Sequence, residues 1–236
     1  MEGYSGMLRL LALTVALLLA GPVAFAAEPY PSRITYAISR EGQPIGRYIV
    51  AFEHKGPLKV VTVDCQVEVK TLGVAAYRYS HRGREEWNGD ELQSLKAQTD
   101  DNGKKFTVAA ERRGSELVVE RTAPAAVASA AADQGYQGPD VSRQVLPGNL
   151  LPTNGWNFGQ VKQTALLNTE NGKVAHVQVT QNGQEMVRMP SGSVETTRYR
   201  YTGDLKMEQW FDAKGRWIKG TFTAFDGSTI EYILQE

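Results

Sequence analysis

Three histidines and one cysteine are the side chains in this sequence best suited to metal binding or nucleophilic catalysis. His54, His81 and His176 form no H-x-x-x-H, H-E-x-x-H or H-x-H arrangement, so the sequence contains no local metal motif. It also lacks a Gly-x-Ser-x-Gly nucleophile elbow and a glycine-rich phosphate loop. We therefore expect no metal site and no cofactor, and we favour binding over catalysis. A hydrolase with a dispersed pair of carboxylates stays open as an alternative.

The single cysteine has two possible roles. Cys65 lies in the run Val61–Val69, where it alternates with four valines and shares their face of an expected strand. One cysteine cannot form an internal disulfide, so the thiol is free either for redox chemistry or metal binding, or acts as a small buried hydrophobe. Its alternation with the valines favours the buried hydrophobe.

His81 lies in a segment, 77–87, that is dense in aromatic and charged groups. Its parity matches two preceding tyrosines and, if no bulge intervenes at Gly83, also Glu85 and Trp87. A histidine, a carboxylate and aromatic rings on one face could bind a polar head group. The same residues also suit an ordinary cross-strand network, which is the commoner arrangement.

Aromatic residues are also concentrated in the last four expected strands, between Tyr199 and Tyr232. They either line a concave ligand-binding face or form an ordinary sheet core, and a hollow sheet allows both at once. The candidate ligand contacts are Tyr77, Tyr79, His81, Trp87, Trp156, Trp210 and Trp217.

Recurrent turn dipeptides indicate the elements that must position these residues. Asn88-Gly89, Asn102-Gly103, Asn182-Gly183 and Asp226-Gly227 supply the positive φ angles that tight hairpin turns need. Short alternating runs between such turns predict an all-β fold with minor helix. We expect one large curved antiparallel meander, or a half-open barrel, of about 12 strands.

Residues 123–167 interrupt this pattern. The alanine-rich stretch 123–132 predicts a short helix or a mobile crossing, and glycines and prolines dominate residues 134–157. Leucines, Trp156 and Phe158 make the segment too apolar for a solvated linker. We expect an ordered, irregular or short-helical crossing packed on the sheet, with one or two helical turns over 161–167.

The first residues resemble a secretory leader. Arg9 precedes an uncharged apolar run that ends at Pro22, and Ala24-Phe25-Ala26 suits a signal peptidase. We expect a signal peptide over residues 1–26, with cleavage after Ala27 or a retained anchor as alternatives. The mature chain, 27–236, is then a single all-β domain without a transmembrane segment, periplasmic or secreted. Equal numbers of basic and acidic residues, 26 each, argue against a nucleic-acid partner.

Several motifs together resemble a family of uncharacterised, secreted proteobacterial proteins. They lie within 36–46, 77–81, 86–89, 99–103, 152–157, 166–169, 210–217 and 226–232. The family has no assigned activity, so the resemblance implies no catalytic residue. Its layout is similar to another uncharacterised periplasmic β family and, more remotely, to the half-open β-barrels of outer-membrane lipoprotein carriers. Those carriers hold acyl chains, which implies an apolar concavity here by analogy of fold alone.

Three functional hypotheses follow from the sequence. The first is a periplasmic, non-catalytic binding or carrier module for a lipid-like or other apolar or amphipathic ligand. The second is an envelope structural or assembly protein that binds a protein partner through a strand edge. The third is a hydrolase with dispersed carboxylates, which requires two carboxylates facing each other across a cleft.

Overall fold

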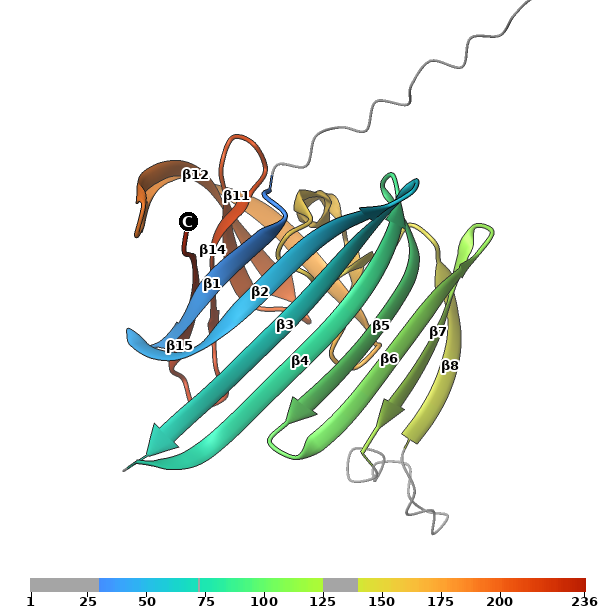
Figure 1. The fold of residues 1–236 in the computed structure, drawn as a ribbon, viewed down its shortest axis with the longest axis horizontal. Coiled ribbons are helices and arrows are strands. Elements are labelled where there is room, and N and C mark those ends of the chain that lie inside the picture. Colours follow the sequence, from blue (N-terminus) through green and yellow to red (C-terminus); the bar gives the residue numbers. More distant parts are fainter. Residues whose placement is uncertain (1–29, 72, 125–139) are drawn as a thin grey trace, which may run out of the picture.

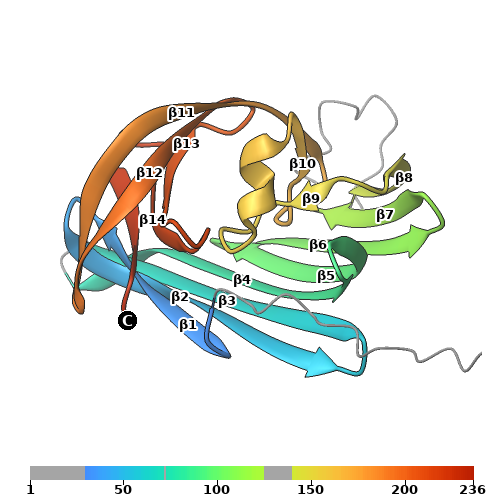
Figure 2. The same cartoon turned by 90° about the horizontal axis from the view of Figure 1, so that it is seen from above.

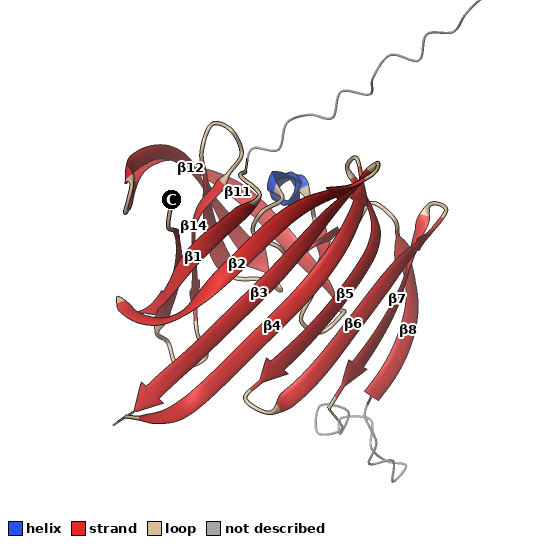
Figure 3. Cartoon of the chain, in the orientation of Figure 1, coloured by secondary structure: helices blue, strands red, loops and turns tan. Residues whose placement is uncertain are grey.

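The fold is known from a computed structural model that describes residues 30–71, 73–124 and 140–236. The expected leader over 1–26 and most of the alanine-rich stretch lie outside the described residues. Strands are the predominant element of the described chain (Figures 1 and 3). The strands before the crossing are β1 (Arg33–Arg40), β2 (Gln43–Lys55), β3 (Leu58–Thr71), β4 (Val74–Asn88), β5 (Glu91–Asp101), β6 (Lys104–Arg113) and β7 (Glu116–Ala123).

The crossing and the second half of the chain contain the remaining elements. They are β8 (Asp140–Pro147), β9 (Leu151–Pro152), the 3-10 helix η2 (Phe158–Lys162), β10 (Ala165–Leu167), β11 (Val174–Met189), β12 (Gly192–Gly203), β13 (Met207–Phe211), β14 (Trp217–Thr223) and β15 (Thr229–Leu234). The expected helical turns over 161–167 are therefore wrong beyond Lys162, because Ala165–Leu167 pairs with β11 as a strand.

All the strands belong to one sheet with the order β8-β7-β6-β5-β4-β3-β2-β1-β15-β14-β13-β12-β11-β10-β9. Every pair is antiparallel except β9 with β10. Neighbouring strands in the sheet are consecutive in the chain, except β1 and β15, which pair with each other. β8 and β9 are consecutive in the chain but do not pair, and they form the two edges of the sheet. The sheet curls strongly without closing, and η2 lies inside the curl (Figure 2). The expectation of an all-β, curved or half-open architecture is confirmed.

Tight turns and alternating burial explain the meander. Glu41-Gly42 and Asn102-Gly103 both have positive φ angles, as type I′ hairpin turns require. In β1, Ile34 and alternate residues after it are buried, which directs one face of the strand into the curl. The turn conformations and the alternating burial both correspond to an antiparallel meander with one face directed into the curl.

The strand count differs from the expected number: the described residues form fifteen strands rather than about twelve. The three additional strands, β8, β9 and β10, all lie in the crossing, which is therefore less irregular than expected.

One expected turn, at Asn182-Gly183, is also wrong. Gln181 pairs with Tyr199 and Gln184 with Thr197, so Asn182 and Gly183 form a bulge within the continuous strand β11.

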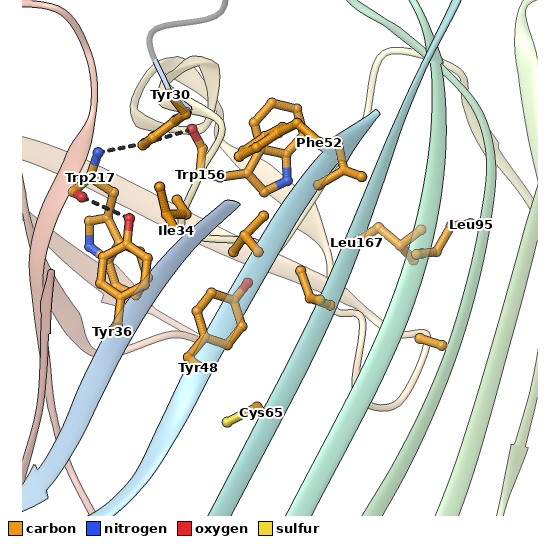
Figure 4. Close-up of a cluster of buried hydrophobic side chains, with 14 of the residues drawn as sticks. Tyr30, Ile34, Tyr36, Tyr48, Phe52, Cys65, Leu95, Trp156, Leu167 and Trp217 are labelled. Carbon is orange, nitrogen blue, oxygen red and sulfur yellow. Dashed lines mark hydrogen bonds between the residues drawn. The ribbon is translucent and has the colours of Figure 1, made fainter. Parts of the chain in front are cut away.

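An aromatic cluster joins the crossing to both halves of the sheet (Figure 4). The Tyr30 hydroxyl accepts the backbone N–H of Trp217 at 2.6 Å and donates to the Trp156 carbonyl at 3.1 Å. Tyr36 donates to the Trp217 carbonyl at 2.8 Å. The Tyr30 ring stacks on Phe52 with centroids 5.3 Å apart. These contacts fix Trp217 at the wall of the interior.

Candidate functional site

A cavity of about 360 Å³ lies inside the curl of the sheet. Its lining comes from β2 to β5, from β13 to β15, and from the crossing between β9 and β11. The volume is at the lower end of the roughly 300–1,000 Å³ typical of small-molecule sites. Both halves of the sheet and the crossing must therefore be in place before the cavity exists.

Three aromatic rings form one wall of the cavity. Tyr48 lies 5.9 Å from Trp217 and 6.1 Å from Tyr232, measured between ring centroids, and the latter two rings are 5.7 Å apart. They project from β2, β14 and β15, which the β1–β15 pairing brings together. Cys65 continues this wall on β3, on the same side of the sheet as Tyr48 (Figure 4). The wall suits the carbon skeleton of a ligand.

A fully buried carboxyl group, Glu85 on β4, also belongs to the lining. Asn154 donates its amide N–H groups to both carboxyl oxygens at 2.9 and 3.0 Å. The indole N–H of Trp87 donates at 2.9 Å and that of Trp156 at 3.3 Å. Burial raises the pKa of Glu85, whereas these donors and the charge of Lys59 oppose the rise. Glu85 thereby anchors the crossing to β4.

His81 and Cys65 face each other across β4 and β3, and both line the cavity. The His81 Nδ1 atom lies 2.8 Å from the Thr99 hydroxyl, and burial lowers the pKa of His81 to about 4. The Cys65 Sγ atom lies 4.0 Å from the Tyr232 hydroxyl, and burial raises the pKa of this thiol to about 12. Near neutral pH both groups are uncharged, so Cys65 is poorly suited as a nucleophile.

Three buried residues of the lining each carry a polar atom without a hydrogen-bond partner: the Oε1 atoms of Gln160 and Gln209, and the indole Nε1 of Trp217. These residues are 0%, 4% and 6% exposed. Unpaired buried polar atoms are uncommon in folded proteins, because each one costs free energy. The three atoms are themselves fully buried, so they present no surface to the cavity.

The family of the chain follows from a comparison with family profiles. Residues 36–235 match the profile described as "Domain of unknown function (DUF6134)". The chain belongs to this family. A comparison with curated protein sequences found no match.

A member of DUF6134, this chain is also similar in fold to a solved structure. That structure is described as a β-barrel-like protein of domain of unknown function DUF1849 from Brucella abortus, and the two chains share 12% sequence identity. The match covers 86% of this chain and 95% of the other, with a TM-score of 0.55. At this identity the likeness establishes a barrel-like fold and nothing about activity.

Of the seven predicted ligand contacts, the structure places Tyr79, His81 and Trp217 in the lining of the cavity. Trp87 and Trp156 are not part of the lining; their ring centroids lie 5.4 Å apart, and both indoles donate to Glu85. The alternation of β4 thus does bring His81, Glu85 and Trp87 to one buried face.

The other two predicted contacts lie elsewhere. Tyr77 donates to Asp101 at 2.7 Å near the exposed end of β4. Trp210 is not part of the lining, although the preceding residue, Gln209, is. Its ring lies beside the Arg198 guanidinium, 5.5 Å away, and its indole N–H donates to Glu185. Neither residue borders the cavity.

Tyr48, Gln160 and Gln209 were not predicted as site residues, and Tyr232 was included only among the aromatic residues of the last four expected strands. The two tyrosines could have been found from the parity of their strands. The glutamines carry no local signal, because an amide side chain in a strand or loop is ordinarily a surface residue. Within the described chain, no group of three or more His, Cys, Asp or Glu side chains could hold a metal ion, and no helix is long and apolar enough to cross a membrane.

Proposed function

We propose that this protein is an exported, non-catalytic binding module that holds a small amphipathic molecule in the cavity inside its curled sheet. The observation that carries the proposal is a single cavity of about 360 Å³ whose lining combines an aromatic wall with the exposed polar residues Glu170, Asp204 and Lys206. The aromatic wall would contact the apolar body of the ligand, and the exposed polar residues would bind its polar end.

The chemistry of the lining supports binding over catalysis. The oxygens of Glu85 already accept four hydrogen-bond contacts from three side chains, which hold the carboxyl group in place. His81 is held against Thr99, and the Cys65 thiol has a strongly raised pKa. A nucleophile paired with a general base would need a different arrangement.

Native mass spectrometry of the mature protein, purified from its own periplasm, tests this proposal. We expect a co-purifying small-molecule mass that is lost on denaturation. In Cys65→Phe the larger side chain would occupy part of the cavity, so this variant should lose that mass, whereas Cys65→Ala should keep it. A bare chain from the host, together with no binding of amphiphiles in solution, would overturn the proposal.

A second candidate function is supported by the open edge of the sheet. β8 is an edge strand, and Val141 and Val145 on it are 68% and 57% exposed. An unpaired edge with exposed apolar side chains can accept a strand from a partner protein. A photo-crosslinking residue at Val145 should capture an envelope protein in cells, and the same residue at Thr107, on the interior strand β6, should not. Equal capture at both positions would contradict edge recognition.

A further inference from the structure

Among the described strands, β8 and β9 lie at the two edges of the sheet. β9 consists of Leu151–Pro152 alone, so it is too short to pair with an added strand. β8 has 8 residues, Asp140–Pro147, and forms the right-hand end of the sheet in Figure 1. The backbone groups on its outer side pair with no described strand, so they are available to a strand of another chain.

One hydrogen bond shows which backbone groups of β8 face this edge. The Gly148 N–H donates to the Ser115 carbonyl at 2.9 Å, one step beyond the paired residues of β7 and β8. Such bonds recur at every second residue of an antiparallel ladder, so the even-numbered residues of β8 point their backbone groups towards β7. The residues that point theirs to the free edge are Val141, Arg143, Val145 and Pro147. A proline fits this row because no N–H is needed towards β7.

The same row of β8 carries its exposed side chains. Val141 and Val145 are 68% and 57% exposed, and the side chain of Arg143 between them is 57% exposed. The alternate residues face the interior, where Gln144 donates to the Gly172 carbonyl at 2.6 Å. β8 is therefore held from within, while an apolar–basic–apolar row lies beside its free backbone groups.

Arg143 restricts the partners that fit this row. Its Nε atom lies 3.6 Å from the Oε1 atom of Glu120 on β7, and both side chains are more than half exposed. An exposed pair of this kind contributes little, and a guanidinium has further N–H donors. A carboxylate on a strand added at the other side of β8 would bind these donors.

A second copy of this chain fits the edge poorly. In the antiparallel register that places Val141 opposite Val145 of the second copy, Arg143 lies opposite Arg143 of that copy. Like charges directly opposite each other destabilise a pair of strands. The row itself contains no carboxylate, and Pro147 supplies no N–H. A partner strand with an acidic residue between apolar ones matches the edge better.

We propose that β8 binds an extended segment of another protein as an added antiparallel strand, with the pattern apolar-x-acidic-x-apolar. The carboxylate lies opposite Arg143, and the two apolar side chains lie opposite Val141 and Val145. This inference rests on edge recognition, the second candidate function above, and it names the sequence that the edge selects.

A peptide titration tests the charge of the partner. Fluorescein-labelled Thr-Val-Thr-Glu-Thr-Val-Thr and the same peptide with lysine in place of glutamate are added to the mature protein at pH 7.5, and fluorescence anisotropy follows binding. We expect the glutamate peptide to bind about fivefold more tightly. Arg143→Ala should remove this preference, whereas Arg82→Ala, on the interior strand β4, should retain it. Equal binding of both peptides to the wild type would overturn the inferred pattern.

N-methylation of the peptide separates strand addition from simple charge attraction. Opposite Arg143, the N–H of the central glutamate points towards β8, whereas the N–H of the next threonine points away. Methylation at the glutamate nitrogen should weaken binding about tenfold, and methylation at the threonine nitrogen should change it less than twofold. Equal effects at the two positions would overturn strand addition.

Two further outcomes would also overturn the inference. If no peptide binds, the inferred pattern is wrong, and crosslinking from Val145 reports separately on whether the edge binds any protein. If the mature protein sediments as a dimer that the glutamate peptide dissociates, the edge belongs to a second copy. We expect a monomer in sedimentation velocity, with or without the peptide.

Discussion

The buried imidazole of His81 should make the stability of the fold depend on pH in a defined window. Burial lowers the pKa of His81 from 6.5 to about 4 in the folded protein. Between these values the unfolded chain binds a proton that the folded protein excludes, so the free energy of unfolding increases with pH there. The stabilising contribution of neutral His81 is therefore fully present above about pH 6.5 and is lost as the pH falls to about 4.

The size of the effect follows from the separation of the two pKa values. At about 1.36 kcal/mol for each pH unit, the fall from 6.5 to about 4 corresponds to a loss of about 3 kcal/mol. Urea unfolding of the wild type and of His81→Gln, followed by tryptophan fluorescence from pH 4 to 8, measures it. On acidification from pH 8 to 4, the free energy of unfolding of the wild type should fall by about 3 kcal/mol more than that of His81→Gln.

His176 is exposed on β11, so His176→Gln should retain the pH dependence of the wild type. His81→Gln loses the contact with Thr99 and is expected to be less stable than the wild type at pH 8, so the slope with pH is the informative quantity and the offset is not. Parallel stability curves for wild type and His81→Gln would show that burial of the imidazole does not govern the acid response.

Three further predictions concern the cavity wall and its supports. Gly155→Ala should destabilise the fold by about 1–3 kcal/mol, because a Cβ atom there would lie 2.2 Å from the Trp217 ring; Gly159→Ala, with nearest contacts of 3.0 Å, is a milder control for urea denaturation. Tyr30→Phe should cost about 1–3 kcal/mol because its hydroxyl bridges two buried backbone groups, and wild-type stability of this variant would contradict that role. Cys65 should react with a thiol reagent only after unfolding, since burial raises its pKa to about 12; rapid labelling of the native protein in a stopped-flow assay would argue against this.

Much of the fold follows from local sequence. Turn dipeptides such as Asn102-Gly103 and the alternation in segments such as Arg33–Arg40 are sufficient for both meanders. The strands of the crossing were missed for a physical reason. β9 and β10 have two and three residues, too few for a period-two signal, and β8 is an edge strand that alternates between half-buried and exposed residues. Asn182-Gly183 has the composition of a hairpin turn and of a bulge alike.

The candidate site was predictable only where it lies on one strand. Parity alone assigns His81, Glu85 and Trp87 to one face of β4. The cavity also depends on which strands become neighbours, and the pairing of Tyr36 with Leu234 joins positions that no local pattern relates. Gln209 and Trp210 show the remaining limit: the aromatic residue was expected at the ligand, and the adjacent amide lines the cavity.

The pairing of β1 with β15 also has a consequence for the order in which the protein folds. It is the one pairing in the described sheet that joins strands not consecutive in the chain. All other neighbours can form from nearby segments, whereas this ladder must close a loop of nearly the whole domain, and such closure slows folding. We therefore expect the two meanders to nucleate separately, and the joining of β1 to β15 to be a late and slow step of folding.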